Sequence, residues 1–327
     1  MKSQLQLLIN VTGDKRVHEI LEDTISSNRS VSAMFKRDYI SSKAELFEKI
    51  PSADVLFSFP VPEAAIKIGT NLKWIHLASA GVERSLTPAL LASKIKLTCS
   101  RGIHANTITE YVFMTMLAFS KNLRQAYTYQ GKHEWRFEEL IEGRFDLGGK
   151  TICIIGLGSI GSRIARLAMV VDMRVIGTAN RVRKIRNVDK VYPASKMKEC
   201  LSHADFVVLS TPLTERTYHL IGQNELAVMK KNAFLVNIGR GRLVDEPALV
   251  MALKEKRIAG AALDVFETEP LPPESPFWDM ENVVVTPHYS GMAEDLWRKV
   301  ANLFCENAIR FANGRRMLGI VNKKEGY

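Results

Sequence analysis

The sequence predicts an α/β protein in which two doubly wound parallel sheets form two domains. The first observation is length, because 327 residues leave room for about two domains at roughly 100 to 200 residues each. The second is that short apolar runs alternate with helix-length segments, which requires crossover connections between parallel strands. The third is a glycine-rich turn at residues 156–161, between an apolar strand and a helix.

The composition is that of a globular chain. Hydrophobic residues make up 46% and charged residues 24%, and 20 Gly and 12 Pro are too few for a low-complexity or collagen-like chain. No stretch has the roughly 18 uninterrupted apolar residues of a membrane helix, and the N-terminal residues do not form a complete signal peptide. The 4 cysteines lack the spacing of a disulfide framework or a metal site. We therefore expect a cytoplasmic protein with no metal and no membrane attachment.

The net charge of +10 favours anionic partners, from nucleic acids to phosphorylated metabolites. The excess is mostly dispersed, and its densest run is residues 181–186. No nucleic-acid reading motif accompanies the basic residues, so we expect no nucleic-acid partner.

The first hundred residues contain short apolar runs separated by helical stretches, which predicts parallel strands joined by crossovers. The predicted strands are residues 5–11, 32–35, 54–59, 72–78 and 95–99.

From residue 147 onward the pattern is clearer, because six candidate strands are apolar nearly throughout, as expected for strands covered on both faces. They are residues 151–155, 173–177, 206–210, 233–237, 260–265 and 282–286, and the helices predicted between them are 162–171, 223–229 and 246–255. Two longer helices, 107–130 and 293–312, flank this unit. Six parallel strands in two halves is the doubly wound arrangement that binds dinucleotides.

The turn Gly156-Leu157-Gly158-Ser159-Ile160-Gly161 has the setting of a Rossmann-type dinucleotide fingerprint. The first glycine allows the tight turn, the second lets the backbone approach the pyrophosphate, and the third lets the helix pack on the strand. The N–H groups at the start of that helix would face the anion. A glycine-rich turn without ligand is the alternative, and the flanking strand and helix argue against it.

The end of the next strand favours NADP over NAD. An acidic residue there binds the ribose 2′-hydroxyl of NAD, whereas a basic one accommodates the 2′-phosphate of NADP. This chain has Asn180 and Arg181 at that place, then Arg183, and no carboxylate until Asp189. We therefore expect NADP as the preferred cofactor, with NAD possible. The plainer interpretation is a solvated basic loop.

Three chemically active side chains follow the last strands, where ligands of doubly wound sheets bind. They are Arg240, Glu269 and His288. An imidazole can move a proton near neutral pH, a carboxylate can orient it, and a guanidinium can bind a substrate carboxylate. Each taken alone is more often a surface or structural residue, but their shared position downstream of a cofactor fingerprint favours catalysis.

At these residues the sequence resembles the D-isomer-specific 2-hydroxyacid dehydrogenase family, most of all its glyoxylate and hydroxypyruvate reductases. The matching motifs extend over nearly the whole chain, at residues 79–82, 156–161, 211–214, 237–245, 263–270 and 286–288. The chain departs from the family at Ser210, where relatives often carry His, and we expect no regulatory extension of the kind that many phosphoglycerate dehydrogenases have.

The resemblance implies a role for each matching residue. Arg240 would bind the carboxylate and carbonyl of a 2-oxo acid, His288 would protonate the carbonyl oxygen, and Glu269 would hold His288 and favour its charged form. Backbone N–H groups of Ala80 and Gly81 would bind the substrate carboxylate. The implied cofactor contacts are Gly156, Gly158, Ser159, Ile160, Gly161, Asn180, Arg181, Thr211, Pro212, Ile238 and Asp264.

The resemblance also implies the architecture. A smaller flavodoxin-like substrate domain would comprise residues 1–100 and 288–327, and residues 101–287 would form the Rossmann-type dinucleotide-binding domain. Relatives are commonly homodimers joined through the cofactor domain, so we expect a homodimer, with the helix after Thr107 either at the subunit interface or simply between the domains.

Two other functions stay open. One is D-3-phosphoglycerate dehydrogenase, which would need a further cationic site for the phosphate. The other is a non-enzymatic, corepressor-like protein that senses NAD(H), since some corepressors of this family retain all three of Arg240, Glu269 and His288. The leading hypothesis is reduction of a small 2-oxo acid to the D-2-hydroxy acid.

Overall fold

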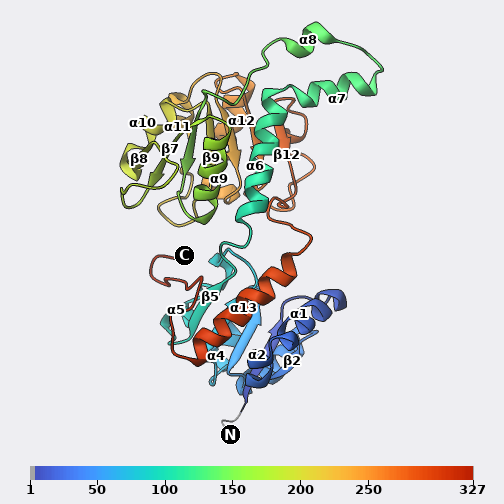
Figure 1. The fold of residues 1–327 in the computed structure, drawn as a ribbon, viewed down its shortest axis with the longest axis vertical. Coiled ribbons are helices and arrows are strands. Elements are labelled where there is room, and N and C mark those ends of the chain that lie inside the picture. The colour runs from blue at the N-terminus through green and yellow to red at the C-terminus, as the bar shows by residue number, and fades with distance from the viewer. Residues whose placement is uncertain (1–3, 327) are drawn as a thin grey trace. The chain divides into compact units, whose positions relative to one another are not determined.

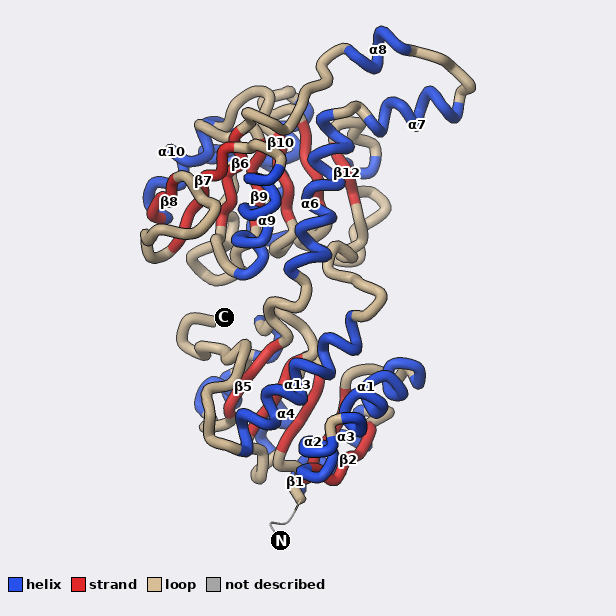
Figure 2. Tube along the Cα trace, in the orientation of Figure 1, coloured by secondary structure: helices blue, strands red, loops and turns tan. Residues whose placement is uncertain are grey.

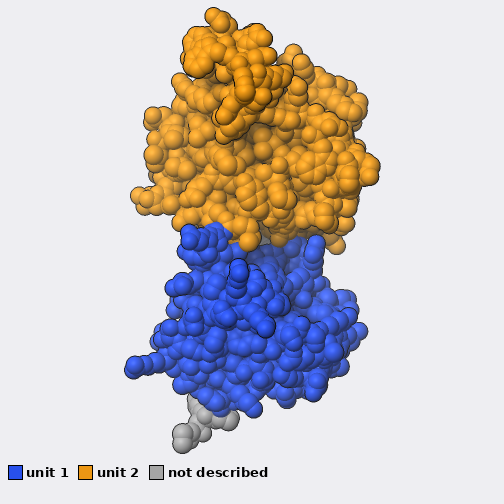
Figure 3. Space-filling model, turned by 90° about the vertical axis from the view of Figure 1, so that its right-hand side faces the viewer, with its two compact units in different colours: residues 1–103, 293–327 blue, residues 104–292 orange. Residues whose placement is uncertain are grey.

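The computed structural model of the protein describes residues 4–326. Tyr327, the last residue of the predicted substrate domain, lies outside this range. The chain divides into two compact units, unit 1 with residues 1–103 and 293–327, and unit 2 with residues 104–292 (Figure 3). His288 thus belongs to unit 2. Each unit contains a parallel sheet with helices between its strands, which confirms the predicted α/β class.

Unit 1 has, within the described residues, a five-stranded parallel sheet in the order β2-β1-β3-β4-β5, which is the flavodoxin-like order. The strands are β1 (Leu5–Asn10), β2 (Phe35–Tyr39), β3 (Val55–Ser58), β4 (Trp74–Leu77) and β5 (Lys96–Cys99). The helices are α1 (Lys15–Ser27), α2 (Arg29–Met34), α3 (Lys43–Lys49), α4 (Glu63–Ile68), α5 (Pro88–Ala92) and α13 (Leu296–Ala312).

The C-terminal helix α13 completes the core of unit 1, and Figure 1 shows it lying over the sheet next to α1. Its Phe304 ring is stacked on the rings of Phe57, at 4.7 Å, and Trp74, at 5.2 Å. Beyond α13 the chain returns to the edge strand β5, where the Cys99 N–H donates to the Gly319 carbonyl at 2.9 Å. This return covers an edge strand that would otherwise expose unpaired backbone groups.

The strand predicted at residues 32–35 is wrong, because this stretch is mostly the helix α2. Asn28 caps α2 by accepting a hydrogen bond from the Val31 N–H at 3.2 Å, and Val31 is buried. The strand β2 comes next and is polar, with four of its five residues outside the core. A search for apolar runs therefore finds the residues before the strand, because an edge strand is only partly covered.

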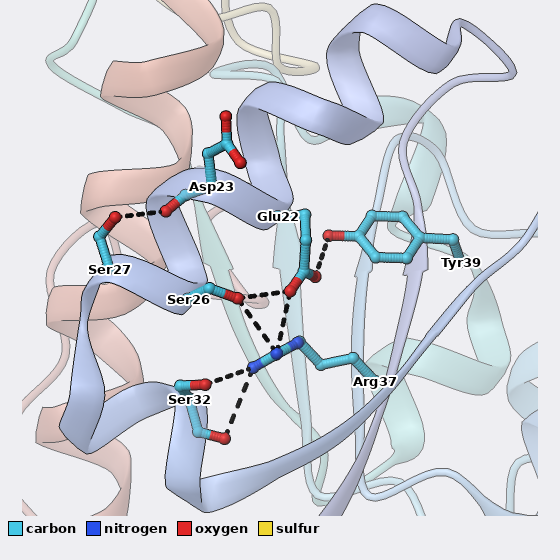
Figure 4. A network of polar contacts seen from close by, with 7 residues as sticks. All are labelled: Glu22, Asp23, Ser26, Ser27, Ser32, Arg37 and Tyr39. Carbon is cyan, nitrogen blue, oxygen red and sulfur yellow. Dashed lines mark hydrogen bonds and ion pairs between the residues drawn. The ribbon is translucent and has the colours of Figure 1, made fainter.

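A polar network holds β2 against α1 and α2 (Figure 4). Arg37 donates to Glu22 at 2.9 Å and to the Ser32 hydroxyl at 3.1 Å, and the Tyr39 hydroxyl donates to Glu22 at 2.8 Å. Burial alone would raise the pKa of Glu22, but hydrogen bonds from Ser26 and Tyr39 and the Arg37 charge lower it below its usual value. The network adds polar contacts to the apolar packing of Phe35 at this edge of the sheet.

Unit 2 has a seven-stranded parallel sheet in its described residues, with the order β12-β11-β10-β9-β6-β7-β8. Counted from β6, this is the Rossmann order with a seventh strand added at one edge. The strands are β6 (Thr151–Ile155), β7 (Arg174–Ala179), β8 (Lys190–Pro193), β9 (Phe206–Leu209), β10 (Phe234–Asn237), β11 (Gly260–Leu263) and β12 (Val283–Val285). The short edge strand β8, which ends in proline, was not among the predicted strands.

The helices predicted at 223–229 and 246–255 match to within one residue, and the helix predicted at 162–171 begins three residues earlier. The short helix at 197–202 was not predicted, and the long helix predicted over residues 107–130 is interrupted. That stretch forms two helices, because Asn122 adopts the left-handed conformation with φ 54° and ends the first. The helices are α6 (Ala105–Ser120), α7 (Leu123–Gly131), α8 (Phe137–Ile141), α9 (Ser159–Val170), α10 (Met197–Ser202), α11 (Gln223–Val228) and α12 (Glu246–Lys254). Figure 2 shows α7 and α8, joined by a loop, extending away from the strands of unit 2.

The strand register brings the candidate site residues to one edge of the unit 2 sheet. Ile155 is level with Leu209, Leu209 with Asn237, Asn237 with Leu263, and Leu263 with Val285. All these strands are parallel, so the segments that follow them emerge side by side at the carboxyl edge, where ligands of doubly wound sheets bind.

Candidate functional site

The glycine turn after β6 is held closely against the neighbouring strand and its own helix. An added Cβ at Gly161 would lie 2.2 Å from the Gly156 carbonyl oxygen, so only glycine lets α9 begin this near the turn. The Ser210 hydroxyl, at the end of β9, donates to that same carbonyl at 2.7 Å. Thr211 and Pro212 follow directly. The turn therefore places the N-terminal N–H groups of α9 at the carboxyl edge, in the arrangement that binds a pyrophosphate.

The end of β7 carries no acidic side chain. Asn180 and Arg181 follow Ala179 and are exposed. The next carboxylate in the sequence, Asp189, accepts a hydrogen bond from the Val175 N–H at 2.7 Å, near the start of β7 and not at its carboxyl end. The position at which an acid would bind the ribose of NAD is therefore occupied by amide and guanidinium groups.

His288 and Glu269 form a hydrogen-bonded pair. Glu269 Oε2 lies 2.9 Å from His288 Nδ1, and Glu269 Oε1 accepts from the Phe266 N–H at 3.0 Å. The His288 side chain is 49% exposed and the Glu269 side chain 29% exposed. Since Nδ1 faces the carboxylate, the other ring nitrogen, Nε2, is directed away from it. This is the arrangement of a histidine whose tautomer and orientation are set by an acid.

Arg240 follows β10 in a tightly fixed turn. The Asn237 side chain accepts from the Gly239 N–H at 3.1 Å and donates to the Arg240 carbonyl at 3.0 Å. An added Cβ at Gly241 would lie 1.8 Å from the Phe266 carbonyl carbon, so the turn packs directly on the segment that leads to Glu269. Ile238, in the same turn, is buried.

A second histidine–carboxylate pair lies beside the first. His219 Nε2 is 2.8 Å from Glu267 Oε1, and the Glu267 N–H donates to Glu246 at 2.7 Å. Burial raises the pKa of Glu246, and the nearby charges of Glu267 and Glu269 raise it further. No motif in the sequence separates His219, Glu267 or Glu246 from solvated charges, so none of the three was expected at the site.

Asp264, one of the expected cofactor contacts, directly follows β11. Its side chain is fully buried and accepts hydrogen bonds from the Thr286 hydroxyl and from the N–H groups of Tyr289 and Ser290, at 2.6, 3.0 and 3.0 Å. These bonds hold the backbone on both sides of His288. Thr286 lies in a matched motif but had no assigned role, and its partner Tyr111, 175 residues away in the sequence, was not expected at the site.

Ala80 and Gly81 belong to unit 1, where they follow β4. The Ser79 hydroxyl donates to the Gly81 carbonyl at 2.7 Å, and the Ser79 carbonyl accepts from the Ser100 N–H at 2.9 Å. Both residues are partly exposed, so the loop offers backbone groups at the carboxyl end of the unit 1 sheet. Arg240, Glu269, His288 and the glycine turn all belong to unit 2.

A Rossmann-order sheet with a dinucleotide turn after its first strand and a histidine–carboxylate pair at the same edge defines a nicotinamide-dependent dehydrogenase. A family model described as the NAD-binding domain of D-isomer specific 2-hydroxyacid dehydrogenases matches residues 113–290. A glyoxylate reductase of Korarchaeum cryptofilum is 31% identical over 296 residues, covering 89% of each chain. The chain belongs to the D-isomer specific 2-hydroxyacid dehydrogenase family and is an oxidoreductase of that family.

Two further relatives bear on substrate and cofactor. A D-3-phosphoglycerate dehydrogenase of Methanocaldococcus jannaschii is 35% identical over 288 residues, covering 86% of this chain and 54% of that protein. The crystal structure of an NADPH-dependent glyoxylate/hydroxypyruvate reductase from Sinorhizobium meliloti, in complex with NADP and sulfate, has 26% sequence identity and a TM-score of 0.87. The match covers 99% of this chain and 100% of that one.

Among residues 4–326, no helix is both long enough and apolar enough to cross a bilayer.

Proposed function

We propose that the protein reduces a small 2-oxo acid of the glyoxylate and hydroxypyruvate class to the D-2-hydroxy acid, with NADPH as the preferred cofactor. The observation that carries this proposal is the His288–Glu269 pair, 2.9 Å apart, at the edge of the sheet that also holds the dinucleotide turn. The family supports the reaction class, and the glyoxylate reductase relative supports the substrate class.

In this proposal, the residues of the chain divide the work of carbonyl reduction. The bound nicotinamide supplies the hydride. Arg240 binds the 2-oxo acid and stabilises the negative charge that develops on the carbonyl oxygen, because a guanidinium is charged and donates in a planar fork. His288 gives that oxygen its proton from Nε2, while Glu269 holds Nδ1 and stabilises the imidazolium. Backbone N–H groups of Ala80 and Gly81 bind the substrate carboxylate.

The residues present fit a dinucleotide phosphate. The close approach at Gly161 brings α9 to the turn, so its first N–H groups hold the pyrophosphate, with Gly156, Gly158, Ser159 and Ile160 around it. Thr211, Pro212, Ile238 and Asp264 follow the neighbouring strands at the same edge. Asn180 and Arg181 contact the adenosine ribose, and the guanidinium pairs with a 2′-phosphate where no carboxylate repels it. NAD is the weaker alternative cofactor.

Oxidation of D-3-phosphoglycerate is the second candidate function. It is favoured by the phosphoglycerate dehydrogenase relative, although the chain spans only about half the length of that protein, 54%. A phosphorylated substrate needs a cation beyond Arg240 to bind its phosphate.

We infer a homodimer formed through unit 2. The helices α7 and α8 have no buried residue, yet these helices, the loop between them and the end of α6 carry large apolar side chains on the surface. These are Met114, Leu117, Leu123, Tyr127, Trp135, Phe137 and Ile141, with Trp135 95% exposed. An apolar surface of this kind typically marks a protein interface.

The cytoplasmic location suggested by cysteine usage stays a prediction.

The proposed function is tested by following nicotinamide absorbance with NADPH and NADH in parallel. The substrates are glyoxylate, hydroxypyruvate, pyruvate and 3-phosphohydroxypyruvate. We expect the highest kcat/KM with NADPH and glyoxylate or hydroxypyruvate. Replacement His288→Ala should lower kcat by about 10²- to 10⁴-fold, the usual contribution of a general acid, with the NADPH affinity unchanged.

The matched control is His203→Ala, which removes an exposed histidine of the same unit. It should leave kcat at the wild-type value. Turnover confined to 3-phosphohydroxypyruvate would replace the proposed substrate with that of the second candidate. A clear preference for NADH would refute the cofactor assignment, and undiminished turnover by His288→Ala would refute the role of His288.

A further inference from the structure

The turn that carries His288 is fastened to α6 at both of its ends. At the first end, the Tyr111 hydroxyl lies 2.7 Å from the Thr286 hydroxyl. At the other end, His104 Nδ1 lies 2.9 Å from the Gly291 carbonyl oxygen. His104 is the N-cap residue of α6 and Tyr111 is seven residues further on, which is about two helical turns, so both side chains lie on the same side of the helix. The helix and its N-cap therefore contact the segment 286–291 at its first and last residues.

The direction of the hydrogen bonds along this chain is fixed. Thr286 has one hydroxyl proton, and it donates that proton to Asp264 Oδ1 at 2.6 Å. Tyr111 must then be the donor to Thr286. Asp264 also accepts from the N–H groups of Tyr289 and Ser290, at 3.0 Å each. The Tyr111 phenol thus donates into a chain whose last acceptor is Asp264, and the same carboxylate binds the backbone N–H groups that follow His288.

The phenol is well placed to influence the geometry of His288. Tyr111 is 5% exposed, and its ring lies edge-on to the Tyr289 ring with centroids 5.8 Å apart. It therefore touches the residue two before His288 and the residue after it. His288 itself has φ 51°, in the left-handed region that residues other than glycine rarely adopt. Such a conformation persists only where the surroundings determine it.

We propose that Tyr111 is a positioning residue for proton transfer by His288, acting through its hydrogen bond to Thr286 and through Asp264. The proposal rests on the proposed function, in which His288 is the proton donor. Glu269 fixes the imidazole ring from its Nδ1 side, whereas the Tyr111–Thr286–Asp264 chain fixes the backbone from which the ring projects. The two contacts together set where Nε2 lies.

The test is Tyr111→Phe, which keeps the ring and removes only the hydroxyl. Small displacements of a catalytic group can cost up to about 10²-fold in rate, so we expect kcat for 2-oxo acid reduction to fall by about tenfold or more. The Kd for NADPH and the KM should stay within about twofold. The control is Thr115→Val, which removes a buried hydroxyl of the same helix that bonds only to the Val112 carbonyl among the contacts described for it. It should leave kcat at the wild-type value.

Repeating Tyr111→Phe in the His288→Ala background separates positioning from a general structural effect. A positioning residue has nothing left to position there, so the residual rate should not fall further. An equal loss in both backgrounds, or a kcat of Tyr111→Phe within about twofold of wild type, would overturn the proposal. If His288→Ala keeps the wild-type kcat, the proposed function is wrong. If His288→Ala is slow but Tyr111→Phe is not, only the role of Tyr111 is wrong.

A second pair of variants covers the case in which Tyr111→Phe does not fold. Thr286→Val removes the relay hydroxyl, and Thr286→Ser keeps it. We expect Thr286→Ser to restore most of the kcat that Thr286→Val loses, because the serine hydroxyl can still accept from Tyr111 and donate to Asp264. Equal kcat for the two variants would contradict the relay.

Discussion

At the scale of single residues, His76 shows how packing decides the protonation of a side chain. It is fully buried in unit 1, against the rings of Phe57, Trp74 and Phe304. The Ser100 hydroxyl donates to the Leu77 carbonyl, so the 3.3 Å contact between Ser100 and His76 Nε2 requires the proton on Nε2. The Thr98 hydroxyl then donates to Nδ1 at 2.8 Å. Burial lowers the pKa of His76 to about 3, so the ring is neutral in the folded chain.

This histidine should make unit 1 sensitive to acid. In the unfolded chain the imidazole takes up a proton at about its usual pKa of 6.5, whereas the folded chain resists protonation down to about pH 3. The unfolded state therefore binds more protons in this range, and the free energy of unfolding should fall as pH decreases, by at most about 1.4 kcal/mol per unit from His76. Urea unfolding followed by tryptophan fluorescence should show a shallower pH dependence for His76→Gln. His203→Gln, at an exposed position, should keep the wild-type dependence, and an unchanged slope for His76→Gln would count against the prediction.

At the scale of elements, the buried strands and the turns after them are where the sequence was most informative. The predicted strand 151–155 has the bounds of β6, because a strand covered on both faces is apolar throughout. The edge strands β2 and β8 were not predicted, because they are only partly covered and are therefore not apolar throughout. The helix α9 begins at Ser159, earlier than the predicted residue 162, since Gly158 is its N-cap and the last three fingerprint residues, 159–161, form its first turn.

The close approach at Gly161 gives a prediction for the glycine turn. A Cβ there would lie 2.2 Å from the Gly156 carbonyl oxygen, a backbone atom, so Gly161→Ala must move α9 away from the turn. We expect the Kd for NADPH, measured by fluorescence titration, to rise by at least about tenfold, since one or two backbone hydrogen bonds to the phosphates are lost. Gly148→Ala is the control, because its Cβ would make only ordinary contacts, the nearest at 3.7 Å. Equal affinities for the two variants would refute the argument.

The site divides similarly into what the sequence could and could not reveal. Arg240, Glu269 and His288 are recognisable because they come within a few residues of the ends of β10, β11 and β12, and parallel strands bring their carboxyl ends to one edge. The contacts of Tyr111 with Thr286 and of His219 with Glu267 join segments far apart in the chain. Such contacts depend on the angle at which a helix or loop crosses the sheet, and apolar periodicity does not encode that angle.

At the scale of the whole molecule, the apolar surface of α6, α7 and α8 predicts self-association. Trp135 and Phe137, 95% and 58% exposed, should become buried in a symmetric contact between two copies of the chain. The double replacement Trp135→Ser with Phe137→Ser should shift the protein toward monomer in analytical ultracentrifugation. Met251→Ser removes an apolar side chain 55% exposed on α12 and should leave the mass unchanged. A monomeric wild-type protein at assay concentration would rule out the proposed dimer.

The division of unit 1 between the two ends of the chain also orders events during synthesis. Residues 1–103 emerge first, yet their sheet lacks α13, whose Phe304 covers Phe57 and Trp74, and its edge lacks the return segment at Gly319. Residues 104–292 are continuous and can complete their own core as soon as they leave the ribosome. At the usual translation rates, the N-terminal segment waits about 10 to 40 s for its partner helix. Unit 2 is therefore able to finish folding before unit 1, although residues 1–103 are synthesised first. We expect that a chaperone would bind residues 1–103 during this interval.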